Sequence, residues 1–120
     1  MPAPDRHTRP WYLTMLLVVA IAGPLFAVPT ALMGRDELMR QFPKLSSTLL
    51  STQVVFAALG VAGAVTILLA RRIGLWFVLA SGAGVVATDL LYESWVHAGV
   101  AAALTTALGL ATRAHWPHLR

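Results

Sequence analysis

Four long apolar runs, almost free of charge, dominate the chain. They cover residues 11–33, 48–70, 73–92 and 95–112. The first holds about 23 residues without a charge, and a helix of that length crosses the roughly 30 Å hydrocarbon core of a bilayer at 1.5 Å per residue. In lipid every backbone polar group needs a partner inside the protein, which restricts spanning structures to helices and closed barrels. Runs of this length predict an all-α polytopic membrane protein, a four-transmembrane-helix bundle.

The composition agrees with a membrane domain. Of the 120 residues, 58% are hydrophobic and only 12% are charged, whereas soluble domains usually carry about 25% charged residues. We expect one domain over residues 1–120, with a polar leader at 1–10 and a basic tail at 113–120. The chain has no cysteine, which excludes a disulfide, a thiolate nucleophile and a cysteine-ligated metal or iron–sulfur site.

The basic residues indicate an orientation in the membrane. The formal net charge is +4, but these residues stand at the ends of apolar runs and not along one face, so no nucleic-acid partner is expected. Four spans place both termini on one side. That side would carry Arg6, Arg9, Arg71, Arg72, Arg113 and Arg120, against Arg35, Arg40 and Lys44 on the other. The positive-inside rule then predicts a multi-pass protein of the cell membrane, N-in and C-in.

The first run has alternative interpretations. A secretory signal peptide also begins with basic residues, here Arg6 and Arg9, before an apolar segment. This run exceeds the usual apolar core of about 7–15 residues, and 26–33 offers no small-residue cleavage site, which favours a membrane span. Pro24 and Pro29 each lack a backbone N–H and predict a kinked or broken helix. A kink would serve packing, and a broken helix would line a transport site.

The longest connection, residues 34–45, has its own pattern. Leu38, Phe42 and Leu45 recur at i, i+4 and i+7, with charged residues on the other faces. The spacing predicts a short amphipathic helix at the lipid interface, acting as a connector, a lid or a docking surface.

Small residues recur at four-residue spacing in three of the runs. Close helix contact in lipid favours such residues, so we expect these strips to pack inside the bundle, although dimers use the same pattern. The strips are Gly60, Gly63 and Ala64; Ala80, Gly84 and Thr88; and Gly99, Ala103, Ala107 and Ala111.

A polar group stands out in the last third of the chain. Asp89, Glu93 and His97 are spaced i, i+4 and i+8, but the chain must reverse near Glu93, and Ser94 is a plausible N-cap for the fourth helix. A bend there would let Asp89 and His97 face each other on neighbouring helices. Because Asp89 lies near a helix C-terminus, where the dipole disfavours an anion, we expect compensation from water, His97, Gln53 or an arginine.

Three interpretations of this candidate polar site stay open. Asp89 can be an interfacial acid satisfied by His97 and water, part of a proton- or cation-coupled path, or part of a metal or acid–base catalytic site. No third and fourth metal ligand can be named, and His97 is the one histidine inside a span, which disfavours haem ligation. We therefore expect no metal and no cofactor, and assign no catalytic residue.

Three features resemble the small four-helix DoxX-like membrane proteins. They are the long first connection, the RRIGLW segment at 71–76 that opens the third run, and the ATDLLY segment at 87–92 followed by a histidine. The resemblance covers roughly the last 50 residues. It implies a membrane-associated four-helix protein, in some members linked to redox processes, and it assigns no functional residue.

Three functions fit these observations. The favoured one is a non-catalytic subunit or accessory protein that interacts with the lipid bilayer and with other membrane proteins or copies of itself. The alternative is a small oligomeric proton- or cation-coupled transporter that uses Asp89 and Glu93. The third is a membrane-embedded enzyme acting on a lipid-soluble substrate.

Overall fold

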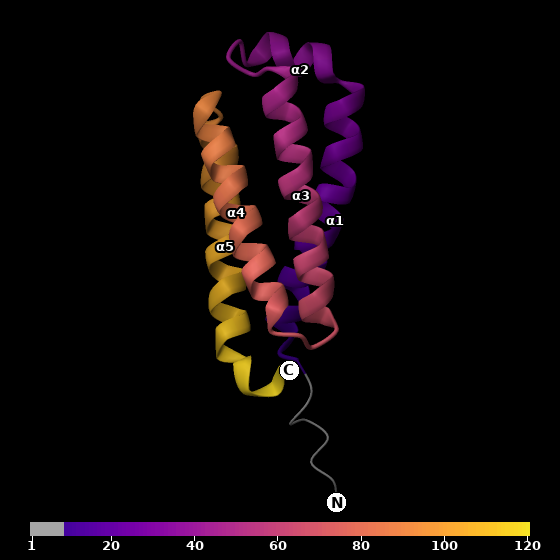
Figure 1. Ribbon diagram of the computed structural model, residues 1–120, viewed down its shortest axis with the longest axis vertical. Helices are drawn as coiled ribbons and strands as arrows, with labels where there is room; N and C mark the ends of the chain where they lie inside the picture. Colours follow the sequence, from indigo (N-terminus) through magenta and orange to yellow (C-terminus); the bar gives the residue numbers. More distant parts are fainter. Residues whose placement is uncertain (1–8) are drawn as a thin grey trace, which may run out of the picture.

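The computed structural model describes residues 9–120 and shows an all-helical bundle (Figure 1). Most of the expected leader lies outside the described residues. The elements in chain order are α1 (Trp11–Met33), α2 (Arg35–Gln41), α3 (Ser47–Leu68), α4 (Ile73–Leu91), α5 (Trp95–Ala114) and the short 3₁₀ helix η2 (Trp116–His118). Residues 9–120 contain no strand, and four of the helices are long and apolar enough to cross a membrane. The predicted fold class is confirmed.

The two ends of the bundle differ. At one end, called the terminal end below, the start of α1 and the C-terminus lie beside the α3–α4 turn (Figure 1). At the other, the loop end, α2 lies across the top of α1 and α3, near the α4–α5 turn. The expected amphipathic helix corresponds to α2, and Leu38 and Phe42 pack there against a small cluster of Leu45, Leu50 and Tyr92.

The helices pack in the order α1, α3, α4 and α5, and α1 also contacts α5. Glycines bring α3 and α4 close together. A Cβ added to Gly63 would lie 2.8 Å from the carbonyl oxygen of Gly74 and 2.9 Å from Phe77 Cβ, which leaves room for no side chain. The small-residue strip of the second span therefore packs inside the bundle, as expected. In the third span Thr88 is buried and Gly84 lies against Phe56, but Ala80 is exposed.

The expectation for the fourth span was wrong for three of its four residues, since only Ala111 packs inside the bundle. Gly99, Ala103 and Ala107 face away from the other helices, and a Cβ added to Gly99 would meet no atom within 4 Å. The buried face of α5 consists of Ala98, Leu108, Ala111 and Thr112. Small residues occur on both faces of this helix, so four-residue spacing could not distinguish the packed face from the free one.

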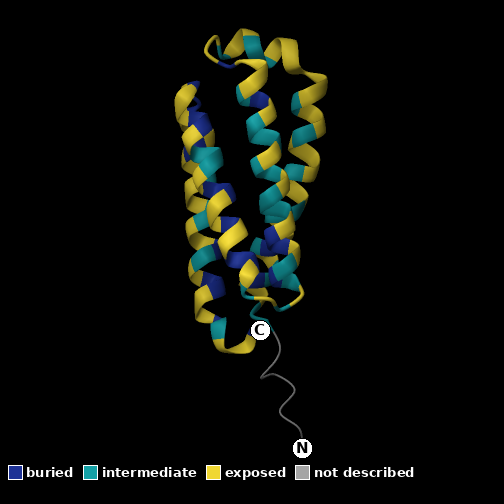
Figure 2. Ribbon diagram, in the orientation of Figure 1, coloured by how far each residue is buried: buried dark blue, intermediate teal, exposed yellow. Residues whose placement is uncertain are grey.

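The main core lies toward the terminal end. It consists of Leu13, Leu17, Ala64, Ile67, Val78, Leu108 and Ala111. The two buried residues of α1, Leu13 and Leu17, are both in its first half. The second half, which contains Pro24 and Pro29, is mainly exposed, like α2 (Figure 2). The helices are thus held together most firmly at the terminal end, and the polar candidate site lies at the other.

Candidate functional site

The candidate site is centred on Asp89, in the last turn of α4 at the loop end. Asp89 is completely buried, with 0% of its surface exposed. Its Oδ1 accepts hydrogen bonds from the Tyr92 hydroxyl, at 2.9 Å, and from Gln53 Nε2 of α3. Its Oδ2 lies 2.6 Å from Nδ1 of His97, one turn into α5. Three helices therefore meet at one carboxyl group, and we call Asp89, Gln53, Tyr92 and His97 the polar network.

A tight C-terminal cap on α4 creates this arrangement. Ser94 N donates to the carbonyl oxygen of Asp89 at 2.8 Å, and Glu93 N donates to that of Leu90 at 3.3 Å. These two bonds form a Schellman motif, in which the residue after the helix takes a left-handed conformation. Glu93 has that conformation, with φ of 63°. The chain reverses within three residues, which places His97 opposite Asp89.

The hydrogen bonds satisfy a group that burial alone would destabilise. A buried carboxyl group is costly without partners, and its place at a helix C-terminus adds an unfavourable dipole. Gln53 and His97, both expected to compensate Asp89, contact it directly. Among residues 9–120 no arginine is a hydrogen-bond partner of Asp89.

Tyr92 was not expected in the site. Its hydroxyl also lies 3.2 Å from Gln53 Oε1, and its ring packs edge-to-face on Phe42 at a centroid distance of 5.4 Å. The signal in the sequence was its position three residues after Asp89, since such residues share a helix face. Tyr92 therefore joins the polar network to the apolar cluster beneath α2.

Glu93 does not join the network. Its carboxylate pairs with Lys44 Nζ at 2.6 Å, and the side chains of both residues are more than half exposed. Ser94 occupies the N-cap position of α5 as expected, but its hydroxyl makes no capping hydrogen bond. Within the described chain, Glu93 acts as a surface residue that ties the α2–α3 connection to the α4–α5 turn.

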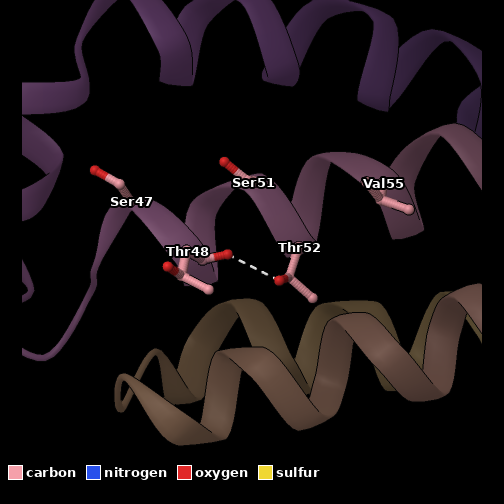
Figure 3. Close-up of a pocket in the computed structure, with 5 residues that line it drawn as sticks. All are labelled: Ser47, Thr48, Ser51, Thr52 and Val55. Atoms are coloured by element: carbon pink, nitrogen blue, oxygen red, sulfur yellow. Dashed lines mark hydrogen bonds between the residues drawn. The ribbon is translucent and has the colours of Figure 1, made fainter.

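The network is most open to the surface at His97, whose side chain is 56% exposed, whereas Gln53 is partly exposed and Asp89 and Tyr92 are buried. The hollows found in the described residues lie elsewhere. One is a shallow depression along the first turns of α3, lined by Ser47, Thr48, Ser51, Thr52 and Val55 (Figure 3). There the Thr52 hydroxyl donates to the carbonyl oxygen of Thr48 at 2.8 Å. The other is a groove between α4 and α5 that includes Gly82 and Thr105 but no member of the network.

The chemistry available to this arrangement is narrow. The carboxyl and imidazole groups can exchange a proton with the surface through His97. Residues 9–120 contain no cluster of three or more histidine, aspartate or glutamate side chains placed to hold a metal ion. The best-supported consequence of the contacts is mechanical, because the network joins α3, α4 and α5 near the loop end, where the apolar core is small.

Comparisons with known proteins assign this chain to no family. No family model, curated protein sequence or solved structure matches this chain. The resemblance to the DoxX-like proteins stays a prediction.

Proposed function

We propose that this protein is a non-catalytic subunit or accessory protein of the cell membrane that binds other membrane proteins through its exposed helix faces. The burial of Asp89 carries the proposal. Both of its oxygens accept or face side chains of the protein itself, and Asp89 lines neither of the two hollows described above. A carboxylate that acts in transport or catalysis must be accessible to its ion or substrate. A structural carboxylate needs hydrogen-bond partners for both of its oxygens.

A surface suited to a partner helix lies on α5. Gly99, Ala103 and Ala107 are exposed there, between the exposed side chains of Val96 and Leu110. We call these five residues the outer face of α5. Small residues let helix backbones approach closely, and close packing drives helix association in lipid. The strip of the second span and most of that of the third pack inside the bundle, whereas Gly99, Ala103 and Ala107 are free to contact a second helix.

The absence of cysteine from the sequence makes this surface directly testable. We expect a single cysteine at Leu110 (Leu110→Cys) to crosslink to a membrane protein, or to a second copy of the chain, in native membranes. A single cysteine at Val55, an exposed position on α3, is the matched control. Adding Ala103→Leu should abolish the Leu110 adduct, because a leucine holds the two backbones apart. Equal adducts at both positions, or an adduct that survives Ala103→Leu, would contradict the proposed interface.

The proposed orientation places both termini inside the cell. The terminal end carries Arg9, Arg71, Arg72, Arg113 and Arg120, and the loop end carries Arg35, Arg40 and Lys44. An excess of basic residues favours the cytoplasmic side.

One observation favours the alternative, an oligomeric proton-coupled transporter. The exposed imidazole of His97 connects the buried carboxyl group of Asp89 to the surface, as the outer half of a proton path would. The α3–α4 contact, one route by which such a path could continue, is closely packed at Gly63 and Gly74. This close packing favours the structural role.

A further inference from the structure

The terminal end collects arginines from four separate segments. Arg9 precedes α1, Arg71 and Arg72 lie in the α3–α4 turn, Arg113 lies in the last turn of α5, and Arg120 follows η2. The acidic residues of the described chain, Asp36, Glu37, Asp89 and Glu93, all belong to the loop end. Within residues 9–120 this positive cluster therefore has no acidic side chain beside it.

Backbone hydrogen bonds hold the cluster in place. Arg72 N donates to the carbonyl oxygen of Arg120 at 2.7 Å, and Arg120 N donates to that of Ala70 at 2.7 Å. Leu119, the residue before Arg120, is buried. The last residues are thus fastened onto the α3–α4 turn, and the arginines of both segments become neighbours.

One indole ring organises two of the cations. The guanidinium of Arg72 lies 5.0 Å from the ring centroid of Trp116, and that of Arg113 lies 5.2 Å from it. Arg72 Nη2 also donates to the carbonyl oxygen of Trp116 at 3.2 Å. Two like charges placed on one ring repel each other, and an anion between them would remove that repulsion.

Two donors in the cluster are without an acceptor. The Nε atoms of Arg9 and Arg72 are buried and have no hydrogen-bond partner among the described residues. Other groups of the same side chains are satisfied, since Arg9 Nη1 donates to the carbonyl oxygen of Leu68 at 2.9 Å. Buried N–H groups without a partner in the protein are rare, and a water or an anion at this end would supply them with an acceptor.

A histidine beside the cluster reflects the same positive environment. His115 is buried, and its ring lies 4.9 Å from that of His118. Burial lowers the pKa of His115, and the positive charges of His118 and Arg9 lower it further.

Aromatic side chains place this end at the level of lipid headgroups. Trp11 at the start of α1 is 76% exposed, and Trp76 in the first turn of α4 is 62% exposed. Tryptophan concentrates at the boundary between hydrocarbon and headgroups. In a bilayer, the arginines just beyond these rings would therefore lie at the depth of the lipid phosphates.

We infer that the arginine cluster of the terminal end binds the headgroup phosphate of an anionic phospholipid. Arg71 and Arg113, both exposed, would contact the phosphate oxygens. Arg72, held by Trp116, would position these two arginines. Guanidinium groups suit this task because their planar donor pairs match phosphate geometry. This site is distinct from the outer face of α5 and does not depend on a protein partner.

The test is lipid binding by the full chain in detergent, measured by native mass spectrometry with phosphatidylglycerol and, separately, with phosphatidylcholine. We expect tight binding of phosphatidylglycerol and no tight binding of phosphatidylcholine. The double variant Arg71→Gln/Arg113→Gln should weaken it at least tenfold. The control Arg35→Gln/Arg40→Gln removes the same charge from the loop end and should change the affinity less than twofold.

Other outcomes would overturn the inference. Equal losses in the two double variants would indicate attraction by net charge without a site. Full displacement of the lipid by millimolar inorganic phosphate would indicate a site for the free ion. Should the double variant fail to fold, Arg71→Gln alone remains decisive, because the exposed Arg71 side chain makes no hydrogen bond or ion pair within residues 9–120. Unchanged binding in that variant would contradict the assignment.

Discussion

Replacing Asp89 tests whether its hydrogen bonds hold the loop end of the bundle together. The Asp89→Ala variant removes three contacts, those with Gln53, Tyr92 and His97. Side-chain hydrogen bonds in membrane proteins contribute about 0.6 kcal/mol on average and up to about 1.7 kcal/mol each. Three such bonds give about 2–5 kcal/mol, which agrees with the roughly 3–5 kcal/mol lost when one partner of a buried pair is removed.

Two further variants separate the role of the hydrogen bonds from that of the charge. Asp89→Asn keeps an acceptor for Tyr92 and Gln53 and can donate to His97 Nδ1, so we expect a loss of about 1 kcal/mol, the difference between charged and neutral hydrogen bonds. Glu93→Gln is the matched control, since it removes a carboxylate from the same turn. Its pair with Lys44 is exposed, and exposed pairs contribute about 0–1 kcal/mol.

The measurement is the free energy of unfolding in mixed micelles, obtained by titration with a denaturing detergent and followed by circular dichroism. The expected order of destabilisation is Asp89→Ala, then Asp89→Asn, then Glu93→Gln. If Asp89→Ala unfolds at the same detergent fraction as the parent, the polar network does not hold the helices, and the structural role assigned to it is wrong.

Three other predictions follow from the packing, the charge and the termini. Gly63→Ala should destabilise the bundle by roughly 1–3 kcal/mol in the same assay, because the new methyl group meets the main chain of α4. Gly99→Ala should not destabilise it, because its methyl group would meet no other atom and alanine favours a helix over glycine. The buried His115 is favoured in its neutral form, so its contribution to stability is fully present above about pH 6.5 and is lost as the pH falls below that value. His115→Gln should therefore flatten the dependence of the melting temperature on pH between about 5 and 7, and an unchanged slope would show that His115 is not responsible. A reporter active only in the cytoplasm should function when fused after Arg120 and fail when inserted near Gln41, and the reverse pattern would contradict the proposed orientation.

Much of the fold could be predicted from the sequence, because length and lack of charge fix where helices can cross a membrane. The chain reversal near Glu93 could also be predicted, and with it the approach of Asp89 and His97, which stand about one turn on either side of it. It was harder to predict from the sequence which faces of the helices pack against each other. Gly63 and Gly99 look alike in the sequence, yet one touches α4 and the other touches no part of the bundle, because contact depends on helix rotation, which spacing does not determine.

The polar site shows a similar limit. Distance along the chain placed Asp89 near His97, but the choice between Glu93 and Tyr92 depended on the left-handed conformation at Glu93. That conformation turns the Glu93 side chain toward Lys44 and leaves the buried position to the tyrosine. A left-handed cap normally favours glycine, so a glutamate at this position could not be recognised as a cap from the sequence.

The structural role of Asp89 is tested most directly by proton flux across proteoliposomes. Purified protein would be reconstituted with a pH-sensitive dye inside, and an outward pH gradient and a membrane potential applied in turn. We expect the parent chain and Asp89→Asn to give the same flux as empty vesicles, because the carboxyl group is saturated and the α3–α4 contact below it is closely packed. A flux that the parent supports and Asp89→Asn abolishes would contradict the account and establish the transporter.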